Sequence, residues 1–212
     1  MPQGVGVRVS SWVRDKLVFN RLVFFVCLQK TCFFIKLEIM DNLEIRRVEL
    51  ADVNQLQKIC RQTFFEAFSN VNTEEDIKKY LEEAFAIKKL TEEIKNEYSE
   101  LYFGILNEVI IGYIKVNFGE SQNELKDNNS LEIERIYILR DFQGKNVGQS
   151  LYEKALSIAQ QKQCDFLWLG VWEHNPRAIK FYQRNGFVEF DKHIFMLGND
   201  EQTDIMMKLQ LK

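Results

Sequence analysis

Histidine and closely paired cysteines are scarce in this sequence, which argues against a metal centre. The chain has only 2 histidines, and its 4 cysteines, at positions 27, 32, 60 and 164, are not paired in the way zinc ligands are. We therefore expect no metal site. Scattered cysteines in a chain without a convincing signal peptide fit reduced thiols, so we expect the protein to be cytoplasmic.

A long apolar run is also missing. The longest candidate, Leu17–Leu28, spans about twelve residues and contains Arg21, whereas a membrane-spanning helix needs about twenty. No small-residue cleavage site follows it. Because Met40-Asp41-Asn42-Leu43 resembles a natural start, we expect residues 1–39 to be a mis-called or non-native extension. The alternative is a targeting or membrane role.

Excess positive charge is missing as well. Residues 1–39 carry six basic and two acidic side chains, so taking their net +4 from the total of −3 leaves −7 for the other 173 residues. Nucleic-acid binding requires a basic patch, and we expect no such partner. An acidic domain suits small polycations, although acidity also serves solubility. We expect no membrane partner, and a homodimer is compatible with this composition.

Two familiar nucleotide-binding strings, GxxxxGK[ST] and GxGxxG, are absent. What the chain has is the turn Gln143-Gly144-Lys145-Asn146-Val147-Gly148, between a strand pattern (apolar at 131, 133, 136 and 138) and a helix pattern (apolar at 147, 151, 155, 158 and 159). A turn that opens a helix presents backbone N–H groups and the positive end of the helix dipole, which favours a phosphate. The alternative to a phosphate site is a purely structural one, in which glycine is present because the turn requires a residue with positive φ.

A second motif, Asn175–Phe187, predicts a short and well-bounded helix. Asn175 suits the N-cap, Pro176 the first helical position and Gly186 the left-handed residue past the end. The preceding run, Phe166–Trp172, predicts a buried strand. On its own, this pattern favours an ordinary core helix.

Taken together, the two motifs resemble the GCN5-related N-acetyltransferase superfamily, because both occur in its order with a helix and a strand between them. The resemblance covers about Asn42 to Leu211. Leu169–Asn175 and Phe195–Asp204 also resemble the bacterial spermidine/spermine acetyltransferases of the PaiA type. The resemblance implies one α/β domain over residues 40–212, with a central mixed, mostly antiparallel sheet flanked by helices.

The resemblance also implies a function. It indicates an N-acetyltransferase that uses acetyl-CoA as co-substrate and acts on a small amine, with polyamines such as spermidine or spermine as the leading acceptors. Two alternatives stay open. One is a catalytically silent acyl-CoA-binding module that regulates a partner, and the other is a transferase that acts on a protein, a peptide or an antibiotic amine.

The cofactor-binding residues follow from the same resemblance. The backbone of Ile136, Tyr137 and Ile138 would pair with the pantetheine arm, and Asn175 would contact the cofactor as well as cap its helix. The pyrophosphate would lie on the turn formed by Gln143, Gly144, Lys145, Asn146, Val147 and Gly148. Asn146 stands where the superfamily usually has glycine. Asparagine tolerates a left-handed conformation, so the turn keeps its shape, but its side chain puts cofactor affinity in question.

Acetyl transfer to an amine requires a base and an acid, since an ammonium has a pKa of about 10.4 and a leaving thiol one of about 8.5. Tyr182 corresponds to the tyrosine that protonates the sulfur in the superfamily, and the alternative for it is core packing. For the base, strand alternation places Glu132 and Glu134 on the face of Ile136 and Ile138. Glu132 matches the glutamate base of histone-acetylating relatives. Glu134 and a water chain are the alternatives.

The remaining elements are predicted from local patterns. These are a strand at Leu43–Val48, a helix capped by Asp52, a helix opened by a capping box at Thr73, a helix from about Lys88 to Tyr98, a hairpin around Asn107-Glu108, a polar loop at Gly119–Ser130 and a last strand at Asp204–Leu211.

Overall fold

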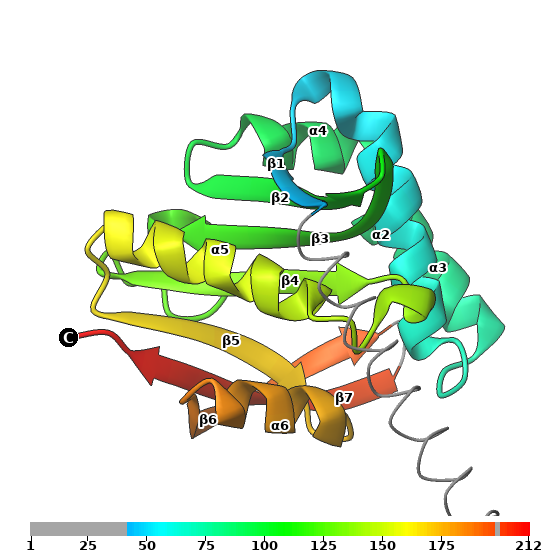
Figure 1. Ribbon diagram of the computed structural model, residues 1–212. Coiled ribbons are helices and arrows are strands. Elements are labelled where there is room, and N and C mark those ends of the chain that lie inside the picture. Colours follow the sequence, from blue (N-terminus) through cyan, green and yellow to red (C-terminus); the bar gives the residue numbers. More distant parts are fainter. Residues whose placement is uncertain (1–41, 198–199) are drawn as a thin grey trace, which may run out of the picture. The chain divides into compact units, whose positions relative to one another are not determined.

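The computed structural model describes residues 42–197 and 200–212. A twisted sheet lies at the centre of the described fold (Figure 1). The described residues form seven strands in the order β1-β2-β3-β4-β5-β7-β6. Neighbouring strands are antiparallel except β4 and β5, which are parallel. The predicted mixed, mostly antiparallel sheet is therefore confirmed. The strands are β1 Leu43–Arg47, β2 Ser99–Leu106, β3 Val109–Phe118, β4 Ser130–Ile138, β5 Phe166–Trp172, β6 Val188–Leu197 and β7 Asp200–Gln210.

Helices cover both faces of this sheet. Helices α2 (Val53–Phe68), α3 (Glu74–Ala84) and α4 (Ile87–Lys95) share one apolar core with Leu101, Phe103 and Tyr113. Helix α5 (Val147–Gln161) lies over β4 in Figure 1, on the opposite face. Successive residues of a strand point to opposite faces, and Phe103 points toward α2, α3 and α4. Its neighbour Gly104 points the other way, because a Cβ there would stand 3.6 Å from Leu151 of α5. The sheet therefore lies between the two helix layers. Helix α6 (Pro176–Arg184) follows β5, and three short 3-10 turns occur at Leu50–Asp52, Gly119–Ser121 and Arg140–Phe142.

The local signals for helix ends are largely confirmed. Thr73 accepts a hydrogen bond from the Asp76 N–H (3.2 Å), and Asn175 accepts one from the Ala178 N–H (3.1 Å). Gly186 has φ +89° just past α6. Asp52 stands at the N-cap position of α2, as predicted, but its side chain does not cap the helix. Its carboxylate accepts from Arg46 and from the Glu49 N–H instead.

The hairpin between β2 and β3 is also confirmed, since Asn107 and Glu108 both have positive φ, as its tight turn requires. Strand β6 was not predicted. It lies at the edge of the sheet, and its pairing with β7 shifts by one residue between Glu189 and Asp191, so it lacks a clean alternation of apolar residues.

Strand β4 contains a bulge that corrects one prediction. Arg135 pairs with Lys115 and Ile133 pairs with Val116, which leaves Glu134 as an extra residue. An extra residue reverses the alternation beyond it, so Glu132 is on the opposite face from Ile136 and Ile138, where the sequence placed all of them together.

The same strand parts from its parallel neighbour. Ser130, Leu131 and Glu132 pair with Phe166, Leu167 and Trp168, and the register ends there. Strand β4 continues to Ile138 and β5 continues to Trp172, so the two strands diverge and leave an opening in the centre of the sheet.

Two predictions concern residues outside this description. The proposed extension, residues 1–39, lies outside the described part of the chain, as do Gly198 and Asn199 of the second PaiA-like segment. Within residues 42–197 and 200–212, no helix is long and apolar enough to cross a membrane.

Candidate active site

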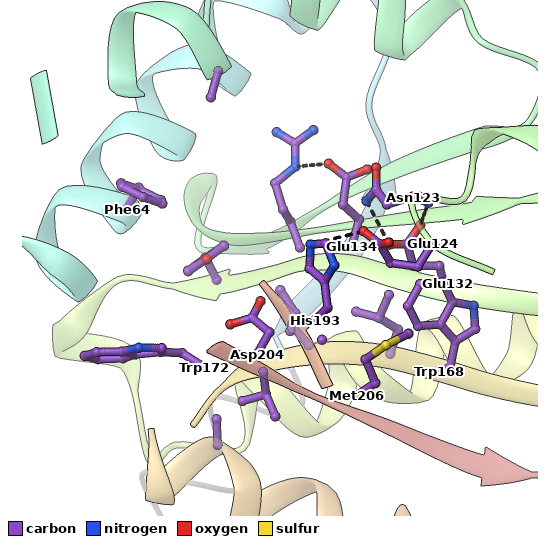
Figure 2. A pocket seen from close by; sticks show the side chains of 18 of the residues that line it. Phe64, Asn123, Glu124, Glu132, Glu134, Trp168, Trp172, His193, Asp204 and Met206 are labelled. Atoms are coloured by element: carbon purple, nitrogen blue, oxygen red, sulfur yellow. Dashed lines mark hydrogen bonds and ion pairs between the residues drawn. The ribbon is translucent and has the colours of Figure 1, made fainter. Parts of the chain in front are cut away.

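A cavity of about 550 Å³ lies where β4 and β5 diverge (Figure 2). Its wall is aromatic and acidic, and its lining residues include members of helices α2, α3, α4 and α6 and of the β6–β7 hairpin. Its aromatic, acidic and polar lining residues include Phe64, Tyr80, Glu124, Glu132, Glu134, Tyr137, Trp172, Asn175, Tyr182, His193 and Asp204. Four of the predicted site residues, Glu132, Glu134, Asn175 and Tyr182, thus meet at one cavity, and the predicted backbone stretch contributes Ile136 and Tyr137 to its wall.

The turn before α5 has the backbone shape that the sequence predicts. Gly144 has φ +78° and Asn146 has φ +66°, so the asparagine does hold a left-handed conformation. The N–H of Ser150 donates to the Asn146 carbonyl at 3.1 Å, in the first hydrogen bond of the helix. The N–H groups of Val147, Gly148 and Gln149 precede that bond and therefore lie at the positive end of the helix dipole. This arrangement fits a phosphate group.

Gln143 ties this turn to its surroundings. Its amide nitrogen donates to the Ile138 carbonyl at 3.2 Å, and its amide oxygen accepts from Arg177 Nη1 at 2.8 Å. The guanidinium of Arg177 also passes close to Gly144, because a Cβ there would stand 3.7 Å from Nη2. Arg177 thus adds a permanent cation to the turn. Sequence reasoning did not assign it to the site, although it lies inside the second motif.

The other residues of the turn have structural duties. Val147 is 1% exposed and anchors the start of α5 in the core. A Cβ on Gly148 would stand 3.1 Å from Cδ1 of Ile138, so glycine lets the helix pack closely on β4. The ammonium of Lys145 lies 5.1 Å from the centre of the Phe142 ring. What the turn offers an anion is therefore mainly its backbone.

The diverging end of β4 presents backbone groups to the opening. The N–H of Leu139 donates to the Ile111 carbonyl, so Leu139 faces β3. Because successive residues of a strand point their N–H and C=O groups in opposite directions, Ile136 and Ile138 face away from β3, toward the opening. Tyr137 faces β3 with its backbone and lines the cavity with its ring.

Glu132 is a buried carboxylate with several hydrogen-bond donors. It is 4% exposed, and it accepts from Asn117 Nδ2 (3.0 Å) and from the backbone and side-chain nitrogens of Asn123 (3.0 and 2.8 Å). Burial raises its pKa, and these hydrogen bonds oppose that rise. The loop between β3 and β4 is fixed to the sheet through this carboxylate.

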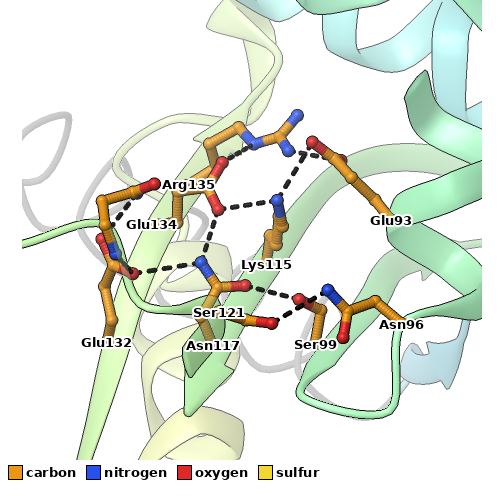
Figure 3. Close-up of polar contacts among 10 residues, drawn as sticks. Glu93, Asn96, Ser99, Lys115, Asn117, Ser121, Glu132, Glu134 and Arg135 are labelled. Atoms are coloured by element: carbon orange, nitrogen blue, oxygen red, sulfur yellow. Dashed lines mark hydrogen bonds and ion pairs between the residues drawn. The ribbon is translucent and has the colours of Figure 1, made fainter. Parts of the chain in front are cut away.

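Glu134 is held by cations (Figure 3). Its carboxylate lies 2.6 Å from Lys115 Nζ and 3.0 Å from Arg135 Nε, and both cations also pair with Glu93 of α4. Burial opposes ionisation, but the charges of Arg135 and Lys115 win and lower the pKa of Glu134 to about 2. A carboxylate with so low a pKa is a poor base at neutral pH.

Tyr182 and Asn175 come from the two ends of α6. Tyr182 is 7% exposed, and burial raises its pKa. Its ring packs on Phe181 and Phe187, as the core-packing alternative requires, yet it also lines the cavity, as the catalytic role requires. Asn175 caps α6 at the cavity wall.

The β6–β7 hairpin supplies residues that sequence reasoning missed. Asp204 and His193 line the cavity, and His193 Nε2 lies 3.2 Å from the Glu124 carboxylate. Trp172 of β5 is the register partner of Asp204. In the sequence, Asp204 is only the end of a matched segment and the start of a predicted strand, because nothing local reveals which cavity a strand will face.

Known proteins resemble this chain in sequence. Residues 58–187 match the model described as "Acetyltransferase (GNAT) family". An uncharacterized N-acetyltransferase from the pepI 3' region of Lactobacillus delbrueckii subsp. lactis is 39% identical over 172 residues, covering 81% of this chain and 99% of that protein. The chain therefore belongs to the GNAT family of acetyltransferases and is an N-acetyltransferase, as the motifs predicted.

More distant relatives have more specific names. A spermidine N(1)-acetyltransferase of Thermoplasma acidophilum is 25% identical over 150 residues, covering 69% of this chain and 88% of that protein. The crystal structure of a PaiA N-acetyltransferase from the same organism, in complex with coenzyme A, shares the fold. Its TM-score is 0.66 at 23% identity, over 79% of this chain and 98% of that chain.

Proposed function

We propose that this N-acetyltransferase uses acetyl-CoA and transfers the acetyl group to a small amine, with a polyamine as the preferred acceptor. The observation that carries the proposal is the single cavity that joins Tyr182 to a group of carboxylates through the opening between β4 and β5. An acyl donor and a cationic acceptor can thus meet from its two sides.

The donor side fits acetyl-CoA. The two left-handed residues of the 143–148 turn and the start of α5 form an anion cradle, and Arg177 adds a positive charge to it. Ile136 and Ile138 offer backbone groups to the pantetheine arm along the opening. Acetyl-CoA supplies the activated acetyl group, and the chain binds and orients it.

The acceptor side fits an ammonium compound. Five carboxylates line the cavity against the two permanent cations Lys89 and Arg135, so an added cation is attracted. The aromatic rings of Phe64, Tyr80 and Trp172 add faces that favour cations and alkyl chains. The spermidine acetyltransferase relative supports the same class of acceptor.

The chemistry needs a proton donor near the sulfur. Burial raises the pKa of Tyr182, so its hydroxyl keeps its proton at neutral pH and is available as a hydrogen-bond donor to the departing sulfur. A carboxylate on the acceptor side must take a proton from the ammonium. Glu132 stays the prediction from family resemblance, and the pairing of Glu134 with Lys115 and Arg135 disfavours that second candidate.

An acceptor screen tests the proposal. The full chain with acetyl-CoA is assayed for thiol release over spermidine, spermine, an aminoglycoside and a lysine-containing peptide. We expect kcat/KM for spermidine or spermine to exceed that for the other acceptors by about 10-fold or more. A higher kcat/KM for the peptide or the aminoglycoside would overturn the polyamine preference, and no turnover with any amine would overturn the function.

A further inference from the structure

Asp204 differs from the other carboxylates of the cavity in having no partner. Glu93 and Glu134 pair with Lys115 and Arg135, Glu132 accepts from Asn117 and Asn123, and Glu124 pairs with His193. No hydrogen bond or ion pair joins the Asp204 side chain to any residue of the described chain. Asp204 is half-buried. A carboxylate partly withdrawn from water without a partner costs free energy, and a cationic ligand reduces that cost.

The position of Asp204 is shaped for a ligand. A Cβ on Gly170 would stand 3.3 Å from Oδ2 of Asp204, so the missing side chain leaves room for the carboxylate over β5. In the view of Figure 2 the carboxylate lies between Trp172 and His193 and points into the cavity. The Trp172 ring offers an apolar and cation-attracting face beside it.

Asp204 also lies at the open end of the sheet. Its register partner on β5 is Trp172, whereas Glu132 pairs with Trp168, four residues or about 13 Å back along the strand. Glu132 is therefore at the closed end, where β4 and β5 still pair. The stretch Ile136–Ile138, where we place the pantetheine arm, is at the end where Asp204 lies.

Asp204, Tyr137 and Tyr182 line the same cavity. Burial chiefly raises the pKa of Tyr137, and the nearby groups Tyr80 and Asp204 raise it further. The titratable groups that interact electrostatically with Asp204 include its register partner His193 on β6 and Tyr137 on β4. Burial raises the pKa of Asp204 and His193 lowers it, which leaves a carboxylate more basic than an exposed one.

We propose that Asp204, not Glu132, is the carboxylate that contacts the acceptor ammonium and takes its proton, an assignment that rests on the proposed function. One N–H proton passes to an Oδ of Asp204, and the neutral nitrogen forms the C–N bond as the C–S bond breaks. After the C–N bond has formed, the nitrogen loses a second proton, and the sulfur of coenzyme A gains one. The numbers of protons lost and gained in the transfer step are therefore equal. Glu132 is a positioning residue that holds the 119–130 loop through Asn123 and is itself held to β3 through Asn117.

The test compares Asp204→Asn with Glu132→Gln on amines of different basicity. n-Butylamine is protonated at neutral pH, while 2,2,2-trifluoroethylamine is largely neutral and needs no base to become a nucleophile. We expect Asp204→Asn to lower kcat/KM by about 10²-fold or more for spermidine and n-butylamine, but by less than about 3-fold for trifluoroethylamine. Glu132→Gln should lower all three values by a similar, smaller factor. KM for acetyl-CoA should not change in Asp204→Asn.

Two further variants keep the result interpretable. Asp204→Glu retains a carboxylate and should recover part of the spermidine activity. Glu173→Gln removes a carboxylate that lies outside the cavity, 3.8 Å from Lys192, and should leave kcat/KM within about 2-fold of the wild type. The thermal midpoint of Asp204→Asn should equal or exceed that of the wild type, because the variant removes a half-buried carboxylate that has no partner.

The outcomes separate the two claims. An active wild type with an equally active Asp204→Asn would overturn the role of Asp204 alone. An equal loss with n-butylamine and trifluoroethylamine would also overturn it, because that pattern reports damage to the fold or to binding. A wild type that acetylates no amine would overturn the proposed function, and this assignment with it.

Discussion

Tyr182 is the residue to which we assign both a packing role and a chemical role. Its ring is buried beside Phe181 and Phe187, and that burial makes the hydroxyl a weaker acid than a free tyrosine. The rise in pKa makes full proton transfer to a thiolate more uphill than the sequence alone implied. In the proposed function, the hydroxyl therefore acts mainly by hydrogen bonding to the negative charge that develops on the sulfur.

Removing this hydroxyl is the first prediction. Tyr182→Phe keeps the ring and should lower kcat by about 10²-fold, with KM for acetyl-CoA little changed. Tyr152→Phe is the matched control, since Tyr152 is another buried tyrosine that packs on Phe181 and Phe187 but does not line the cavity. Steady-state kinetics of both variants decides the point. An unchanged kcat in Tyr182→Phe would return this residue to a packing role.

Among elements, the turn between β4 and α5 is the one whose backbone matters most. Gly144 has φ +78°, a left-handed conformation in which any residue with a Cβ is strained. Asn146 has φ +66° and adopts the same conformation with a side chain present. We predict that Gly144→Ala weakens acetyl-CoA binding by about 5-fold or more, and that Asn146→Gly leaves it equal or tighter. Isothermal calorimetry of the two variants measures this directly. Weaker binding in Asn146→Gly would mean that the asparagine side chain itself helps to hold the ligand.

The bulged strand β4 carries a second element-scale prediction, on pH and stability. The pKa of Glu134 falls from 4.5 to about 2 on folding, so its contribution is fully present above pH 4.5 and is lost as the pH falls toward 2. Glu134→Gln leaves Lys115 and Arg135 with less compensation and should cost about 3 kcal/mol at pH 7. The difference between variant and wild type should shrink below pH 4.5 in urea unfolding. A difference that stays constant from pH 7 to pH 3 would contradict this account.

How much of these elements the sequence predicts depends on the range of the interaction. The turn at Gly144 and the caps at Thr73 and Asn175 are confirmed, because each is set by the residue and its immediate neighbours. The bulge at Glu134 could not be predicted, since it exists only in the register between β3 and β4. That single extra residue made the predicted placement of Glu132 beside Ile136 wrong.

The site follows the same rule. Asn175 and Tyr182, which the second motif singles out, line the cavity, while Asp204 and His193 reach it only through the pairing of β5, β7 and β6. Arg177 was inside a motif but gained its role through a contact with Gln143, 34 positions away in sequence. Family resemblance predicts Glu132 as the base. The structure adds that its carboxylate oxygens already accept hydrogen bonds from Asn117 and Asn123.

At the scale of the whole molecule, the charge of the first 39 residues is opposite to that of the remaining chain, and a truncation tests whether these residues are needed. We predict that the chain from Met40 onward folds and acetylates as well as the full chain, because residues 1–39 carry charge opposite to the domain and an apolar run too short to span a bilayer. Thermal unfolding and kcat/KM of both proteins measure this. A loss of more than about 2 kcal/mol would indicate that the segment packs on the domain. Recovery of only the full chain with membranes would indicate targeting.

The most direct test of the central claim is product analysis of spermidine incubated with acetyl-CoA and the full chain. We predict that mass spectrometry finds spermidine carrying one acetyl group, in an amount equal to the coenzyme A released. We also predict that Tyr182→Phe slows the formation of both products together. Coenzyme A released without acetylated spermidine, or spermidine left unmodified while a peptide or aminoglycoside is acetylated, would contradict the central claim.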